Sequence, residues 1–123
     1  LGGEIAVAYA AMDERIRAIA FHSYGGSVGN FRGASGQNRP HYCHMIPGTG
    51  RQFTKEDVFA LLAPRPVLAL RGTEQPFSNP GFEAALRAAW TGLGGDSRLT
   101  VGSAPGGHEF FVAPAAEFFA SAL

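Results

Sequence analysis

The sequence predicts an α/β fold in which parallel strands carry helices on both faces. Three observations lead to this prediction: helical and strand patterns alternate along the chain, the strand patterns are short and mostly apolar, and glycine or proline separates the elements. Strands that alternate with helices are typical of βαβ units, and strands covered on both faces are apolar throughout. With 123 residues, the chain is expected to form a single domain, 1–123.

The first expected element is an Ala-rich helix over residues 4–12. Its apolar residues recur at helical spacing, at Ile5, Ala8, Tyr9 and Met12. Polar residues at 13–15 interrupt this pattern, and residues 16–21 are mostly apolar, which predicts a short buried strand. A helix that leads into a buried strand through a tight turn is half of a βαβ unit.

Residues 22–53 differ in composition from the rest of the chain, because Gly, Asn, Ser and Pro dominate, with aromatic residues between them. A stretch of this length without regular structure is uncommon in a compact domain and is usually a functional loop, a lid or a disordered segment. The aromatic and aliphatic side chains within it favour a packed loop or lid that borders a pocket.

Two further helices and a strand are expected after this loop. Thr54, with an acidic residue three positions later, resembles a capping box and opens a short helix that ends before Pro64. Residues 66–71 have the clearest strand pattern in the chain. Asn79 and Pro80 then open a helix. The apolar face of this helix would consist of Phe82, Ala85, Leu86 and Ala89.

The last expected strand, residues 98–101, is separated from a final helix beginning at Pro114 by the turn Gly106-Gly107-His108. Glycine tolerates positive φ and close backbone approach, so this turn can direct an imidazole out of the sheet into a cleft. Histidine is suited to proton transfer near neutral pH. A histidine in a solvated loop is the alternative interpretation of the same residues.

The charge content of the chain excludes some partners and suggests others. Ten basic residues balance ten acidic ones, so no electrostatic argument favours nucleic acid or an anionic membrane, and neither partner is expected. No apolar run approaches the roughly 20 residues of a membrane span. Charged residues make up 16% of the chain, against about 25% in typical domains. This low content predicts a fragment whose surface meets further protein.

Four segments of the chain resemble the esterases grouped around dienelactone hydrolase and acetyl xylan esterase, within the α/β-hydrolase superfamily. The most specific match is Leu-Leu-Ala-Pro-Arg-Pro-Val-Leu at 61–68, which is similar to the segment leading into the family's penultimate strand. Residues 1–16 resemble the segment after the nucleophile serine of the G-x-S-x-G elbow. Residues 72–77 and 106–108 resemble the loops that carry the triad acid and the triad histidine. The resemblance implies the C-terminal part of an α/β-hydrolase fold, truncated within the nucleophile elbow.

The resemblance also implies catalytic roles for individual residues. The serine would stand immediately before Leu1, whose backbone N–H would be an oxyanion donor, and His108 would transfer the proton. The family usually has Asp where this chain has Gln75, and a neutral amide cannot stabilise the imidazolium that forms on the histidine. Glu74 is therefore the candidate acid if its side chain turns inward. A salt-bridged surface carboxylate is the other interpretation of Glu74.

A second candidate nucleophile is Ser23, because residues 21–26 lack only the first glycine of G-x-S-x-G. The residues after it are poor helix formers, whereas a nucleophile elbow needs a helix next. The more favoured role of Ser23, together with Tyr24, is to line a pocket.

A metal site is considered at His41, Cys43 and His44. Their spacing places at most two of the three side chains on the same side of the chain, and no fourth ligand is nearby, so a structural loop is favoured over a metal site. No metal and no organic cofactor is expected.

On this basis the chain is predicted to be a fragment of a serine hydrolase. The whole enzyme would cleave carboxylic esters of small molecules or carbohydrates. The alternative is a catalytically inactive, hydrolase-like remnant or a binding module, which the missing serine and Gln75 both favour. Without the preceding strands the sheet would expose an open, apolar edge, which predicts self-association.

Overall fold

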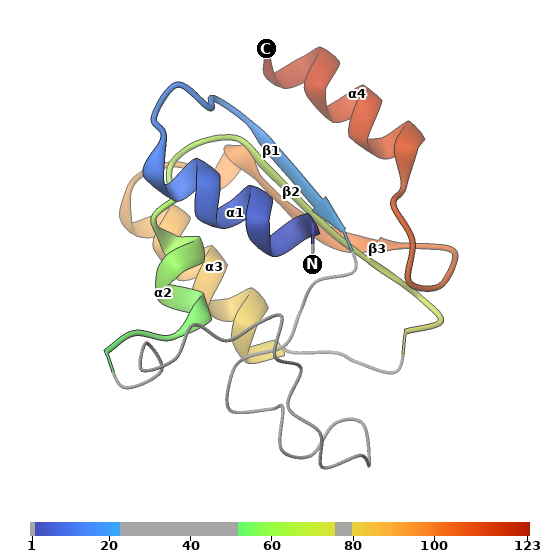
Figure 1. Ribbon diagram of the computed structural model, residues 1–123, viewed down its shortest axis with the longest axis horizontal. Helices are drawn as coiled ribbons and strands as arrows, with labels where there is room; N and C mark the ends of the chain where they lie inside the picture. Colours follow the sequence, from blue (N-terminus) through green and yellow to red (C-terminus); the bar gives the residue numbers. More distant parts are fainter. Residues whose placement is uncertain (1, 23–51, 76–79) are drawn as a thin grey trace.

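The computed structural model describes residues 2–22, 52–75 and 80–123. Helices and strands alternate along the described chain (Figure 1), as the sequence predicts. In chain order the elements are α1 (Gly2–Met12), β1 (Ile19–His22), α2 (Lys55–Ala60), β2 (Val67–Gly72), α3 (Pro80–Gly92), the 3₁₀ helix η4 (Asp96–Arg98), β3 (Leu99–Ala104) and α4 (Val112–Ala122).

The three strands form one parallel sheet in the order β1-β2-β3. In the register, β1 ends with His22 opposite Leu70, whereas β2 and β3 continue to the pair Gly72 and Ala104. Because the strands are parallel, their carboxyl ends lie at one edge of the sheet, which is where open α/β sheets bind ligands. His22, Gly72 and Ala104 mark this carboxyl edge.

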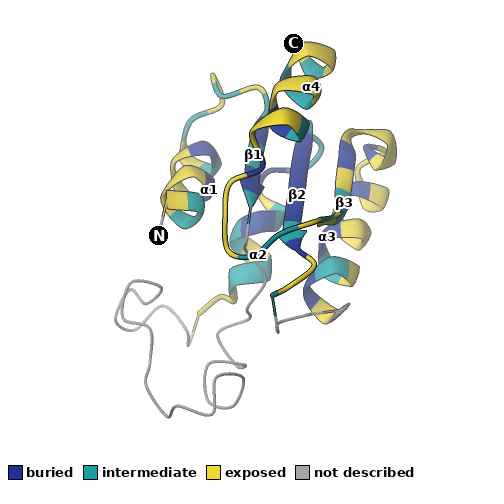
Figure 2. Cartoon of the chain, turned by 90° about the vertical axis from the view of Figure 1, so that its right-hand side faces the viewer, coloured by how far each residue is buried: buried dark blue, intermediate teal, exposed yellow. Residues whose placement is uncertain are grey.

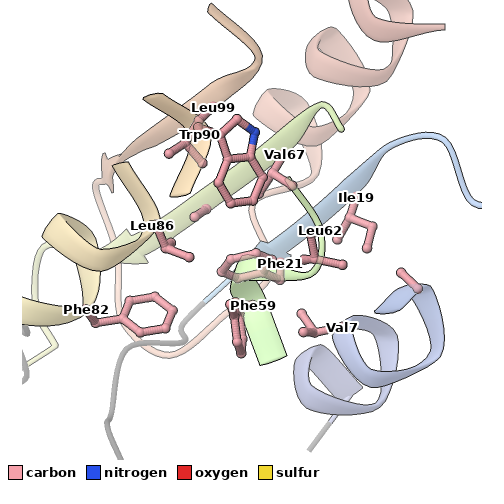
Figure 3. Close-up of a cluster of buried hydrophobic side chains, with 12 residues drawn as sticks. Val7, Ile19, Phe21, Phe59, Leu62, Val67, Phe82, Leu86, Trp90 and Leu99 are labelled. Atoms are coloured by element: carbon pink, nitrogen blue, oxygen red, sulfur yellow. The ribbon is translucent and has the colours of Figure 1, made fainter. Parts of the chain in front are cut away.

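Apolar clusters cover both faces of the sheet, which confirms the predicted α/β architecture. α1, α2 and α3 pack on one face and α4 on the other (Figure 1). Successive residues of β2 alternate between the two clusters, as the period of a strand requires: Val67 and Ala69 belong to one, Leu68 and Leu70 to the other. The larger cluster (Figure 3) contains Val7, Ala10, Ile19, Phe21, Phe59, Leu62, Val67, Ala69, Phe82, Leu86, Trp90 and Leu99.

The face that α1 turns to the core differs from the predicted one. Val7 and Ala10 are buried, whereas the predicted positions Ile5, Tyr9 and Met12 are 59%, 55% and 79% exposed. α1 carries apolar residues around most of its circumference, so several stripes have helical spacing and the spacing alone cannot select one. The small side chain of Ala10 lies where the helix meets the core.

Arg65 links the beginning of β2 to the end of α1. Its Nη1 donates to the carbonyl oxygens of Ala10 at 2.7 Å and Ile16 at 3.1 Å, and its Nε donates to that of Leu62 at 3.2 Å. The last carbonyls of a helix have no partner within the helix, and a guanidinium can supply several donors to them. The Ala-Pro-Arg-Pro segment therefore holds α1, α2 and β2 together.

The same contacts explain why the first strand is shorter than predicted. Residues 16–21 were expected to be extended, but β1 begins at Ile19. The N–H of Ile16 donates to the carbonyl of Asp13 at 3.2 Å, and the carbonyl of Ile16 accepts from Arg65. Ile16 therefore belongs to the turn after α1.

The capping box predicted at Thr54 is present. The N–H of Asp57 donates to Oγ1 of Thr54 at 3.2 Å, and the N–H of Thr54 donates to the Asp57 carboxylate at 2.6 Å.

The last helix, α4, begins at Val112, two residues before the expected Pro114. Pro114 therefore lies in the first turn of the helix, where proline is tolerated because the N–H groups there have no partner within the helix. Among the described residues, no helix is long and apolar enough to cross a membrane.

Candidate active site

The segments that extend from β2 and β3 are joined to each other at the carboxyl edge. The N–H of Thr73 donates to the carbonyl of Ala104 at 2.9 Å, and the N–H of Glu74 donates to that of Gly106 at 3.0 Å. These bonds join the two segments just beyond the ends of their strands. The segment that carries His108 is thereby fixed against the segment that carries Gln75.

Two glycines permit this close approach. Gly72 is buried, and a Cβ atom there would overlap the carbonyl oxygens of Gly106 and Gly107. Gly106 has a φ of +134°, in the region that favours glycine. The β2 end and the His108 segment can therefore touch through their backbones only because these positions lack side chains.

The side chain that His108 meets is that of Gln75. Nε2 of Gln75 lies 2.9 Å from Nδ1 of His108, and Oε1 of Gln75 accepts from the N–H of Gly72 at 3.0 Å. The Gln75 side chain is half-buried, and the His108 ring is exposed. The partner of Nδ1 of His108 is thus a neutral amide.

Glu74 has a different environment. Its backbone is part of the pairing with Gly106, and its side chain is exposed to solvent. The N–H of Gln75 donates to the carbonyl of Gly72 at 3.2 Å, so these two residues lie in a turn, and only the Gln75 side chain makes the contact to His108. The contact to Nδ1 favours Gln75 as the partner of His108, and the role of Glu74 as triad acid stays a prediction.

His22 is a third side chain at the carboxyl edge, and its sequence context does not single it out. Its Nδ1 accepts a hydrogen bond from the N–H of Phe111 at 2.7 Å. Its ring stacks on Phe110, with the centroids 4.3 Å apart and an interplanar angle of 23°, and lies 5.3 Å from the ring of Phe111. The signal that could have identified it is its position at the end of a parallel strand.

The surroundings of His22 favour a neutral imidazole. Burial lowers the pKa of His22 below its usual value of 6.5, because the charged form loses hydration. The accepted hydrogen bond at Nδ1 places the hydrogen of the neutral ring on Nε2. This Nε2 is buried and has no hydrogen-bond partner among the described residues. His22 therefore holds the segment 105–111 through the hydrogen bond from the Phe111 N–H, which only the neutral ring can accept.

α1 begins at this same edge of the sheet and runs away from it (Figures 1 and 2). In a nucleophile elbow, the helix after the serine starts at the carboxyl edge in the same way.

Three of the remaining predicted site residues lie outside the described part of the chain: Leu1, Ser23 and Tyr24. The residues considered for a metal site, His41, Cys43 and His44, also lie outside it. Among the described residues, no three His, Cys, Asp or Glu side chains form a group that could hold a metal ion.

The parallel sheet with helices on both faces defines the chain as an α/β unit. In particular, the structure is similar to a carbohydrate esterase family 15 (CE15) glucuronoyl esterase from Caldicellulosiruptor kristjansonii, with a TM-score of 0.64 and 21% sequence identity. The match covers 94% of this chain and 38% of the esterase. No family model and no curated protein sequence matches the chain.

Proposed function

We propose that this chain is part of a serine hydrolase that cleaves carboxylic esters, with His108 as the residue that transfers the proton. The observation that supports this most directly is the position of His108 at the carboxyl edge, with Nδ1 held by a residue just beyond the end of the neighbouring strand. The similarity of the fold to that of an esterase supports it further.

In the proposed reaction a serine hydroxyl attacks the carbonyl carbon of the ester while a histidine takes the hydroxyl proton. The tetrahedral intermediate collapses, the bond to the alcohol oxygen breaks, and the histidine returns the proton to that oxygen. The serine would precede Leu1, whose N–H would stabilise the oxyanion. Ser23 and Tyr24 would line the pocket.

Esters of carbohydrates are the substrate class that we favour. The side chain that contacts His108 is a neutral amide, and the chain carries no net charge, so neither gives a reason to expect an anionic substrate. The structural relative is a carbohydrate esterase by name. Acetylated or otherwise esterified sugars therefore come before charged small molecules as test substrates.

The proposal is tested by ester hydrolysis in a polypeptide extended upstream to include the proposed serine. p-Nitrophenyl acetate serves as the probe. We expect the extended polypeptide to hydrolyse it and the His108→Asn variant to lose at least 10²-fold in rate, as loss of a general base does. A variant that retains the full rate would overturn the role of His108. Turnover by the 123-residue chain alone, if it depends on His108, would move the nucleophile to Ser23.

A hydrolase-like unit without catalytic activity is the second candidate function. The contact between the Gln75 amide and His108 favours it, because an amide does not stabilise an imidazolium. Under this alternative the extended polypeptide neither hydrolyses the ester nor reacts covalently with a phosphonate probe for activated serines. It would still bind acylated sugars in a calorimetric titration.

A further inference from the structure

The Gln75 side chain bridges two groups of different hydrogen-bonding capacity. At one end is the backbone N–H of Gly72, which can only donate. At the other end is Nδ1 of His108, which can donate or accept according to the tautomer of the ring. The requirement at Gly72 therefore decides which end of the amide faces which group.

The N–H of Gly72 lies beyond the described end of β1, and its partner is the Oε1 atom of Gln75. The N–H of Thr73 points toward β3, where it meets the carbonyl of Ala104, so the N–H of Gly72 points to the opposite side, toward β1. The described residues of β1 end opposite Leu70, two residues earlier along β2. Because Gly72 is buried, an unpaired N–H there would be unfavourable.

The bond to Gly72 fixes the direction of the amide. Oε1 accepts from Gly72, so Nε2 faces His108, and a rotation of the amide by half a turn would bring two N–H donors together at Gly72. The NH₂ group has only donors to offer. Nδ1 of His108 must then accept, and the hydrogen of the neutral ring must sit on Nε2.

We propose that Gln75 is a positioning residue that holds neutral His108 in the tautomer with its hydrogen on Nε2. The functional consequence of this assignment rests on the proposed ester hydrolysis. Because Nε2 carries the hydrogen in the favoured tautomer, His108 can take the proton of a serine only through the less populated tautomer, so proton transfer is slowed and not abolished. In the favoured tautomer Nε2 can donate to an oxygen atom of a bound ester, carboxylate or sugar, so the resting site is organised for binding an oxygen acceptor.

A carboxylate at position 75 would reverse this arrangement. Unlike an amide, a carboxylate accepts at both of its oxygens, so it can serve the Gly72 N–H and a hydrogen on Nδ1 of His108 at the same time. Nε2 is then free to accept a proton. In serine proteases, replacing the triad acid by its amide lowers kcat by about 10⁴-fold through this change of tautomer.

The tautomer can be read directly from the ring ¹⁵N resonances of His108 in the 123-residue chain, in alkaline buffer where the imidazole is neutral. His108→Asn assigns the signals. We expect the hydrogen on Nε2 in the unaltered chain and on Nδ1 in Gln75→Glu. Glu74→Gln is the matched control, since it exchanges the same two groups one residue earlier, and it should leave the tautomer unchanged. A hydrogen on Nδ1 in the unaltered chain, or no change in Gln75→Glu, overturns the assignment.

Activity provides an independent second measurement. In the extended polypeptide, Gln75→Glu should raise the rate of p-nitrophenyl acetate hydrolysis by as much as about 10⁴-fold. A tautomer that switches as expected while the rate stays at background would sustain the positioning role of Gln75 and reject ester hydrolysis. A rate that rises without a change of tautomer would reject the positioning role and support the hydrolase.

Discussion

The backbone N–H of Phe111 donates to Nδ1 of His22 over a distance of 2.7 Å, and this bond joins the end of β1 to the segment that carries His108. Protonation of His22 would place a second hydrogen in the path of that donor. The charged ring would also remain in contact with Phe110 and Phe111, away from water. The contact is therefore incompatible with an imidazolium.

We expect the chain to lose stability in mild acid because of His22. Its pKa in the folded chain is below the ordinary 6.5, since burial penalises the charge, so the unfolded chain binds the proton at higher pH. This contribution is intact above about pH 6.5 and is lost as the pH falls through the folded-state pKa. Urea unfolding at several pH values between about 7.5 and 5 measures it.

His22→Asn is the control for this pH dependence. Oδ1 of asparagine can accept the Phe111 N–H in place of Nδ1 and does not titrate. The variant should lower stability slightly at neutral pH and flatten the loss between neutral pH and about pH 5. An unaltered slope in this variant would assign the acid sensitivity to other groups.

Replacement of Arg65 by alanine is expected to destabilise the fold by about 3 kcal/mol, because several carbonyls lose a charged donor at once. The affected carbonyls include those of Ala10, Ile16 and Leu62. Arg65→Lys retains the charge but not the fork of donors, so an intermediate loss is expected. The free energy of unfolding in urea is the measurement.

Arg15 provides the matched control for Arg65. It is exposed and pairs with the nearby Asp13 through local hydrogen bonds. Exposed ion pairs contribute little to stability, so Arg15→Ala should leave the unfolding transition almost unchanged. If both alanine variants destabilised the chain equally, the contacts of Arg65 with the carbonyls would not explain its effect.

Self-association is a third expectation. β1 pairs with β2 along one side in the described chain, and the exposed apolar residues Ile5, Tyr9 and Met12 lie on the helix packed beside it. Sedimentation velocity over a range of concentrations should reveal species larger than a monomer. Tyr9→Lys should weaken this association, whereas Ala88→Lys, which adds the same charge at an exposed site of α3, should not. A monomer at all concentrations contradicts the expectation.

The sequence predicts the fold better than it predicts the site. The alternation of elements, the capping box at Thr54 and the apolar face of α3 all appear in the structure, because each depends on local spacing or on one short-range contact. The buried face of α1 is predicted wrongly, since Ile5 and Tyr9 have the same kind of helical spacing as Val7 and Ala10. Only the packing of the helix against β1 and α2 distinguishes the two stripes.

The partner of His108 could not be derived from spacing either. Glu74 and Gln75 are adjacent, and which of them faces His108 depends on how the end of β2 meets the segment 106–108. That contact is long-range, and spacing along the chain carries no information about it. His22 was missed for a similar reason: its contact with Phe111 joins residues 89 positions apart in the chain.

The backbone contact at Gly72 yields the final prediction. A Cβ at this position would overlap the carbonyl oxygens of Gly106 and Gly107, which are backbone atoms and cannot rotate away. Gly72→Ala should therefore separate the end of β2 from the His108 segment and destabilise the chain by about 2 kcal/mol, as overpacking does. Gly92→Ala is the control: a Cβ at the end of α3 meets nothing within 4 Å and should leave stability unchanged or slightly raised.

The two glycine variants also separate a local effect at the site from a general loss of stability. Because the Gly72 N–H holds the Gln75 amide, which in turn meets His108, a displaced β2 end should shift the ring resonances of His108 in Gly72→Ala. Gly92→Ala should leave those resonances in place. Unfolding in urea and the ¹⁵N spectrum of the histidine ring are the two measurements. A Gly72→Ala chain with unaltered stability and an unaltered His108 spectrum would show that the close approach of the two segments is not required for the site.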